Sequence, residues 1–97
     1  MQTIVDIGTF ITRHPGIHAG CPIIAGTGVT VRRIASEYKM GLSAEEIVTE
    51  ISHLTLAQVY AALTYYHANQ TEIEADLADQ AAQADRLEAE HRSSYRA

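Results

Sequence analysis

Apolar and polar residues follow two different patterns on either side of about residue 30. Up to that point the sequence has no helical periodicity, and its apolar residues predict short extended segments, at Ile4, Val5, Ile7, Phe10 and Ile11. From Val31 onward, apolar residues recur every three or four positions, as in helices that bury one face. The pattern predicts a mainly α fold, in which short N-terminal β-strands lead into a trihelical, helix-turn-helix-like core and a long C-terminal amphipathic helix.

The segment from Gly20 to Val31 is apolar and rich in glycine. It predicts a short buried strand, a tight turn and a helix N-cap, at Ile23 and Ile24, at Gly26 to Gly28, and at Thr30. A Walker-type phosphate loop has four residues between its glycines and then a lysine, whereas five residues separate Gly20 from Gly26 here and no lysine follows. The spacing therefore matches no phosphate-binding fingerprint.

Helix start and stop signals divide the next forty residues into three helices with short connections. The first begins at Val31, and Gly41 is placed to end it. The second and third each open with a capping box, Ser43-Ala-Glu-Glu46 and Thr55-Leu-Ala-Gln58. The inward positions expected on the three helices are Val31, Ile34, Ala35 and Tyr38, then Ile47, Val48 and Ile51, then Leu56, Val59, Tyr60, Leu63 and Tyr66.

Beyond about Asn69 the composition changes to alanine and acid. Residues 72–97 contain three basic and seven acidic residues, so they carry most of the chain's formal net charge of -5. An apolar stripe recurs every three or four residues, which predicts one long amphipathic helix, at Ile73, Leu77, Ala81, Ala84 and Leu87. We therefore divide the chain into a strand lead plus helix-turn-helix-like domain, residues 1–71, and an acidic C-terminal helix, residues 72–97.

Length and composition limit the class of protein. A chain of 97 residues that is 46% hydrophobic fits one small folded domain. It has neither an apolar stretch long enough to cross a bilayer nor the start of a signal peptide, so we expect a soluble cytoplasmic protein with no membrane partner. A trihelical unit of this size has a modest core, and the strand pair and alanine-rich helix offer surfaces for a second copy, which predicts a homodimer.

The residue types that carry catalysis or bind metals do not form a convincing site. His18-x-x-Cys21 brings two ligand types together, but no second pair completes a tetrahedral zinc site. Cys21 fits the common role of a small buried thiol, and Glu45-Glu46 is explained by helix capping. We expect no catalytic residue, no metal and no cofactor.

The chain from Ile11 to about Tyr65 resembles domain-of-unknown-function family 433. The residues that carry the resemblance are Ile11-Thr, Pro15-Gly-Ile, Gly20-x-Pro-x-Ile-x-Gly-Thr27, Gly41-x-Ser-x-Glu-Glu-Ile47, Leu54-Thr55, Ala62-Leu63 and Tyr65. Members resemble antitoxins of the VapB type, which implies a dimer that binds a PIN-like ribonuclease toxin and represses its own operon. Two positions depart from the family pattern, because Gly28 replaces the usual arginine and Cys21 a frequent lysine, and both changes remove positive charge.

A helix-turn-helix protein places the second helix of the motif in the major groove, which here is Thr55 to about Asn69. That helix contains no lysine or arginine, although affinity for DNA rests largely on neutralised phosphates. The candidates for DNA contact are Arg13, Arg32, Arg33, Lys39, Gln58 and Tyr65. A solvated helix face is the simpler explanation of Arg32 and Arg33, so DNA binding is only weakly supported.

The C-terminal helix is the better candidate for binding a protein partner. Its apolar residues fit a groove on another protein or on a dimer mate. PIN-type toxins, by resemblance to their family, carry metal-binding carboxylates, and an arginine of this helix that reached them would neutralise them. The candidates are Ile73, Leu77, Leu87, Arg86, Arg92 and Arg96.

These observations favour a dimeric, non-enzymatic antitoxin of a type II toxin–antitoxin system, which binds a PIN-like nuclease toxin and, as a weaker addition, its own operator DNA. The alternatives are a stand-alone helix-turn-helix DNA-binding regulator without a toxin, and a small metal-binding or ligand-binding domain.

Overall fold

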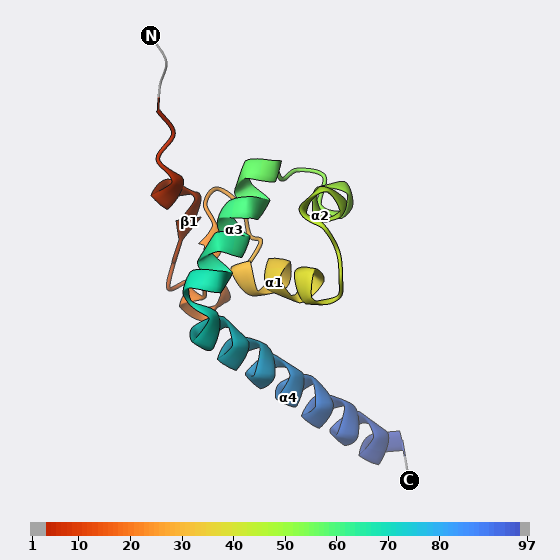
Figure 1. The fold of residues 1–97 in the computed structure, drawn as a ribbon. Helices are drawn as coiled ribbons and strands as arrows, with labels where there is room; N and C mark the ends of the chain where they lie inside the picture. The colour runs from red at the N-terminus through yellow and green to blue at the C-terminus, as the bar shows by residue number, and fades with distance from the viewer. Residues whose placement is uncertain (1–3, 96–97) are drawn as a thin grey trace.

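The computed structural model describes residues 4–95, with side chains as far as residue 90. Four helices dominate it, preceded by two short strands and two 3-10 turns (Figure 1). The helices are α1 (Val31–Lys39), α2 (Ala44–Glu50), α3 (Leu56–Ala68) and α4 (Gln70–Tyr95). The mainly α fold with a short N-terminal strand pair, expected from the sequence, is confirmed.

The N-terminal thirty residues are only partly extended. The structure forms a 3-10 turn, η1 (Ile7–Phe10), where the sequence pattern predicted extended backbone, because the side chain of Asp6 caps the N–H of Gly8. Strand β1 (Ile11–Thr12) then pairs antiparallel with β2 (Ile23–Ile24), and a second 3-10 turn, η2 (His18–Gly20), lies between them. The glycine turn after β2 closes through a bond from the N–H of Thr27 to the Ile24 carbonyl (3.0 Å).

The predicted starts of the three core helices are confirmed. The Thr30 hydroxyl accepts from the N–H of Arg33 and caps α1, and both capping boxes have both of their hydrogen bonds. Helix α1 stops at Met40, after which Gly41 has φ +99°, a backbone conformation that favours glycine. These local contacts satisfy backbone groups that a helix end otherwise leaves unpaired.

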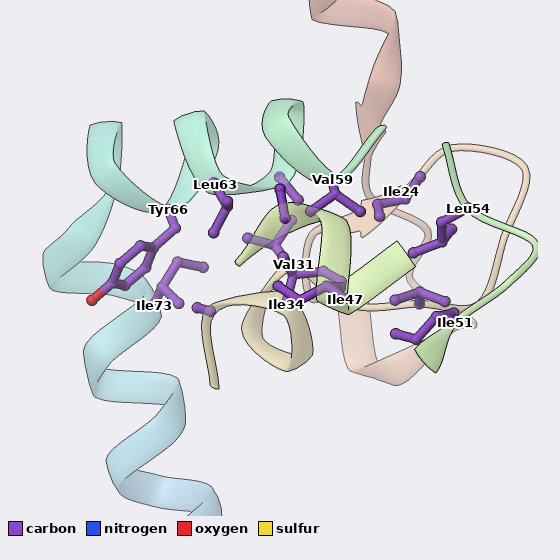
Figure 2. Packing of buried hydrophobic residues seen from close by; sticks show 14 residues of the cluster. Ile24, Val31, Ile34, Ile47, Ile51, Leu54, Val59, Leu63, Tyr66 and Ile73 are labelled. Carbon is purple, nitrogen blue, oxygen red and sulfur yellow. The ribbon is translucent and has the colours of Figure 1, made fainter. Parts of the chain in front are cut away.

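The core lies between α1, α2, α3 and the first turns of α4 (Figure 2). The buried positions on α3 are Val59, Ala61, Ala62, Leu63 and Tyr66. The expected inward positions Val59, Leu63 and Tyr66 are therefore confirmed. Leu56 and Tyr60 were wrongly expected to be buried, since they are 42% and 51% exposed. Of the two alanines, Ala62 belongs to the core cluster, to which α1 also contributes. Tyr38, expected on the inner face of α1, is also largely exposed.

Helix α4 leaves the rest of the molecule and extends away from it (Figure 1). We call residues 4–69 the body, residues 70–77 the root of α4, and residues 78–95 the arm. The radius of gyration is 16.1 Å, against about 12–13 Å for a compact chain of this length, and the longest extent is 69 Å. The shape is therefore a small helical body with a projecting helical arm.

Candidate functional site

The root of α4 is part of the core, whereas the arm is not. Ile73 is fully buried beside Tyr66 of α3, and Leu77 packs against the edge of the same cluster. From Ala78 to Glu90 every residue is exposed, including Leu87 at 65%. The apolar stripe predicted for this helix thus has two parts, one covered by the body and one uncovered. The division of the chain at residue 72 stays a prediction.

One ion pair joins the N-terminal segment to the root. The Arg13 guanidinium donates to the Glu72 carboxylate and to the Tyr65 hydroxyl of α3 (2.7 Å), and lies 3.4 Å from the Gly20 carbonyl. The bond to Glu72, followed by that to Tyr65, raises the pKa of Arg13 above its usual value. The DNA-contact candidate Arg13 therefore contacts both a second candidate, Tyr65, and an acid of α4.

A second ion pair joins α1 to the root. The Lys39 ammonium donates to both oxygens of Glu74 (2.8 and 2.9 Å), and the Tyr66 hydroxyl donates to the same carboxylate (3.2 Å). The contact with Lys39 lowers the pKa of Glu74, while the bond to Glu74 raises that of Lys39. Burial, followed by the bond to Glu74, raises the pKa of the Tyr66 phenol. A third DNA-contact candidate is thus neutralised by an acid of α4.

The remaining DNA-contact candidates are dispersed. Gln58 closes the capping box of α3, where its Oε1 accepts from the N–H of Thr55 (2.8 Å). Arg32 is half-buried and directs Nη1 at the Cys21 sulfur (3.3 Å). Arg33 is exposed on the first turn of α1. The structure therefore places the six candidates at four separate points of the body, and the contact between candidates that it shows is the one between Arg13 and Tyr65.

The partner-binding candidates lie along α4. Ile73 and Leu77 pack against the body, while Leu87 and Arg86 are exposed on the arm. Arg92 is in the last turns of the helix, but its side chain, like all of Arg96, lies outside the described residues.

A pocket of about 330 Å³ opens where α1 faces the first turn of the arm. Its lining comes from η2, the glycine turn, α1 and α4, and consists of His18, Gly28, Thr30, Arg32, Arg33, Ser36, Glu37 and Gln80. The sequence pattern did not indicate this pocket, because its residues are far apart in the chain, from His18 to Gln80. Gly28, which replaces the family arginine, has no positive φ, and a Cβ there would meet nothing within 4 Å. The backbone at this position therefore accepts a side chain.

Two further classes of site were searched among the described residues. No group of three or more His, Cys, Asp and Glu side chains is close enough to hold a metal ion. In residues 4–95, no helix combines the length and apolar character needed to cross a membrane.

Comparisons with known proteins bear on the body more than on the arm. Residues 11–66 match the model of a family described as "Protein of unknown function (DUF433)". The fold is similar to the crystal structure of a DUF433 member from Anabaena variabilis, with a TM-score of 0.68 and 26% sequence identity over 72% of this chain and 69% of that one. A search of curated proteins found no match.

Proposed function

The chain belongs to the DUF433 family, and on that premise we propose that it is a non-enzymatic protein-binding module of the antitoxin type. Its body is the scaffold and its arm docks into a groove on a nuclease partner, a PIN-like toxin. The observation that carries this proposal is the continuity of one apolar stripe across the end of the body. The stripe is buried at Ile73, meets the core edge at Leu77, and continues uncovered to Ala84 and Leu87.

The spacing of these residues gives the arm a single apolar face. At 100° per residue, Leu77, Ala84 and Leu87 lie on the same side of the helix, and we call these three residues the seam. An isolated helix with so little apolar area is marginal in water, so a partner that covers the seam would stabilise it. A groove that continues from the edge of the body would meet the whole seam at once.

The charge beside the seam selects the kind of partner. Asp76 near the end of the root and Asp79 and Asp85 on the arm are acidic side chains, and Arg86 is the one base on α4 among the residues up to Glu90. Two copies of such a helix repel each other, whereas a groove with basic rims attracts it. The arm therefore favours a basic partner protein over a second arm.

The test is co-purification with the product of the neighbouring reading frame, if that frame has the spaced aspartates of a PIN nuclease. Truncation after Ala78 keeps the buried root and removes the arm, so the body should remain folded and the complex should be lost. Leu87→Asp places a charge in the seam, and Ala82→Asp places the same charge on the opposite face as a matched control. We expect only Leu87→Asp to abolish the complex. An undiminished complex after the truncation would refute the proposal.

Arg86 provides a separate test of inhibition. It lies on the opposite side of the arm from the seam. Among the arm residues up to Glu90 it is the arginine that could reach the catalytic carboxylates of a toxin. If it does so, Arg86→Gln should leave the complex intact and restore nuclease activity within it.

We further propose that the chain forms a homodimer through its N-terminal segment. Ile4, Val5 and Ile7 are largely exposed, next to a two-stranded sheet that is too small to be stable by itself. A second copy would cover these side chains. In sedimentation experiments at micromolar concentration, Ile7→Asp should yield a monomer and Leu87→Asp should leave a dimer. A wild-type protein that sediments as a monomer would contradict this.

The second candidate function, a stand-alone DNA-binding regulator, has less support. The outward face of α3 presents Leu56, Tyr60 and Thr64 and no lysine or arginine, and Arg13 and Lys39 are paired with acids of α4. Tight binding needs several neutralised phosphates. A shift assay on the upstream DNA at several salt concentrations measures this directly, and a steep loss of affinity with salt would favour the regulator.

A further inference from the structure

The pocket between α1 and the arm has a chemistry that the proposed partner binding does not use. Its lining includes two guanidinium groups, Arg32 and Arg33, and the imidazole of His18. The Ser36 hydroxyl and the Gln80 amide add two more groups that can donate hydrogen bonds. Polar side chains from three elements therefore line one small volume.

Local backbone structure holds the histidine at the rim. His18 and Ala19 have φ of 48° and 55°, an uncommon conformation for residues other than glycine. This turn brings His18 Nε2 to 3.0 Å from the Gly28 carbonyl, across from the start of α1. If Nε2 carries the proton and donates to that carbonyl, the ring is held in one orientation beside the two arginines.

We propose that this pocket binds a small phosphate monoester, held between Arg32 and Arg33 of α1 and Gln80 of the arm. A phosphate monoester has several strong acceptor oxygens, which match guanidinium, hydroxyl and amide donors. The volume of about 330 Å³ is at the lower end of the range of small-molecule sites. The first turn of α1 adds the favourable field of a helix N-terminus.

The surroundings of the pocket select a small ligand over a nucleic acid. On α4, Asp76 lies one turn before Gln80 on the same face, and Asp79 precedes it directly. These carboxylates would repel the neighbouring phosphates of a duplex, whereas a single phosphate group has no such neighbours.

Glu37 is the one acid in the lining, and it opposes an anion. Its carboxyl is hydrogen-bonded to that of Glu50, which raises its pKa, while Arg33 acts in the other direction. Removing the Glu37 charge should therefore strengthen binding, which gives the proposal a variant with a gain of affinity. Because Gln80 belongs to the arm, a bound ligand would also fasten the first turn of the arm to the body.

The experiment is a titration of the full-length protein with phenyl phosphate, followed by the backbone amide NMR signals of Arg33, Ser36 and Gln80. We expect saturable shifts with a Kd on the order of 1 mM. Arg33→Gln should weaken binding about ten-fold or more, the loss expected for one charge-assisted contact, and Arg86→Gln, the same charge change on the arm, should leave it unchanged. Glu37→Gln should strengthen binding, and its matched control Asp85→Asn should not.

Three results would overturn the proposal. The first is the absence of saturable shifts at these amides with phenyl phosphate. The second is an equal loss of affinity in Arg33→Gln and Arg86→Gln, which would indicate general charge attraction only. The third is a response of the same amides to a short DNA duplex but not to phenyl phosphate, which would make the pocket a reader of nucleic acid backbone. Far-UV circular dichroism of each variant checks that the wild-type helix content is kept.

Discussion

Ile73 is the residue through which the body holds α4, and its truncation tests the division between root and arm. Its side chain is fully buried among the core residues around Tyr66 and Leu63. Ile73→Ala removes three carbon atoms, which is about 2.4 kcal/mol of transfer free energy at about 0.8 kcal/mol per carbon. The cavity left behind raises the expected loss in unfolding free energy to roughly 3–4 kcal/mol. Alanine is a strong helix former, so the loss comes from packing.

This loss is large for a protein of this size. At about 2.1 cal/mol/K of unfolding entropy per residue, a chain of 97 residues should lose about 15–20 °C of Tm. The matched control is Leu87→Ala, because Leu87 belongs to the same stripe but is 65% exposed, and a change within about 0.5 kcal/mol is expected there. Thermal and urea unfolding followed by far-UV circular dichroism measure both variants.

The reasoning would be refuted if Ile73→Ala lost less than about 1 kcal/mol, far below the usual cost of a buried isoleucine. It would also be refuted if Leu87→Ala lost as much as Ile73→Ala, because the arm would then be buried in the free protein. A loss at Leu87 that depended on protein concentration would identify the burying surface as a second copy of the chain.

Three further predictions concern single contacts. The hydrogen bonds to Ser43 lower the pKa of Glu46, so the ionised carboxylate stabilises the folded protein fully above the unfolded pKa of 4.5, and this stability is lost as pH falls through the lower folded pKa. Urea unfolding at several pH values should therefore show that the free energy of unfolding falls more steeply with acid in the wild type than in Glu46→Gln, and parallel pH profiles would contradict this. Gly41→Ala should cost about 1–2 kcal/mol because of its φ of +99°, whereas Gly16→Ala, in open space, should stay within about 0.5 kcal/mol in the same assay. In a double-mutant cycle, the half-exposed ion pair of Arg13 and Glu72 should show a coupling energy below about 1 kcal/mol that disappears in about 1 M salt. A coupling energy that persists at this salt concentration would contradict the expectation that solvent and salt screen the pair.

Much of the fold was predictable because its signals are local. A capping box involves residues three positions apart, so Ser43 with Glu46 and Thr55 with Gln58 placed two helix starts correctly from sequence alone. The same holds for the Thr30 cap.

The inner face of α3 was harder to predict because it has apolar residues almost all around. Hydrophobicity favoured Leu56 and Tyr60, but α1 and α2 pack against the side of α3 that carries Val59, Ala62 and Leu63. Periodicity cannot separate two apolar faces of one helix, so the packing partner decides which of them is buried.

The two candidate sites, the arm and the pocket, differ in how far their recognition depends on long-range contacts. The arm's residues were recognisable from composition and spacing, since an amphipathic acidic helix has a pattern within one segment. The pocket was not recognisable, because His18, Arg33 and Gln80 approach one another only after the chain has folded.

The sequence by itself determined where the helices begin, that the chain ends in an acidic amphipathic helix, and the family to which it belongs. These properties depend on neighbouring residues, whose hydrogen bonds and periodicity are set within a few turns. Only the tertiary structure decided that Arg13 and Lys39 are paired with Glu72 and Glu74, and that the stripe on α4 is covered at Ile73 and open at Leu87. The stripe has one spacing throughout, so its two halves differ only because the body ends beside one of them.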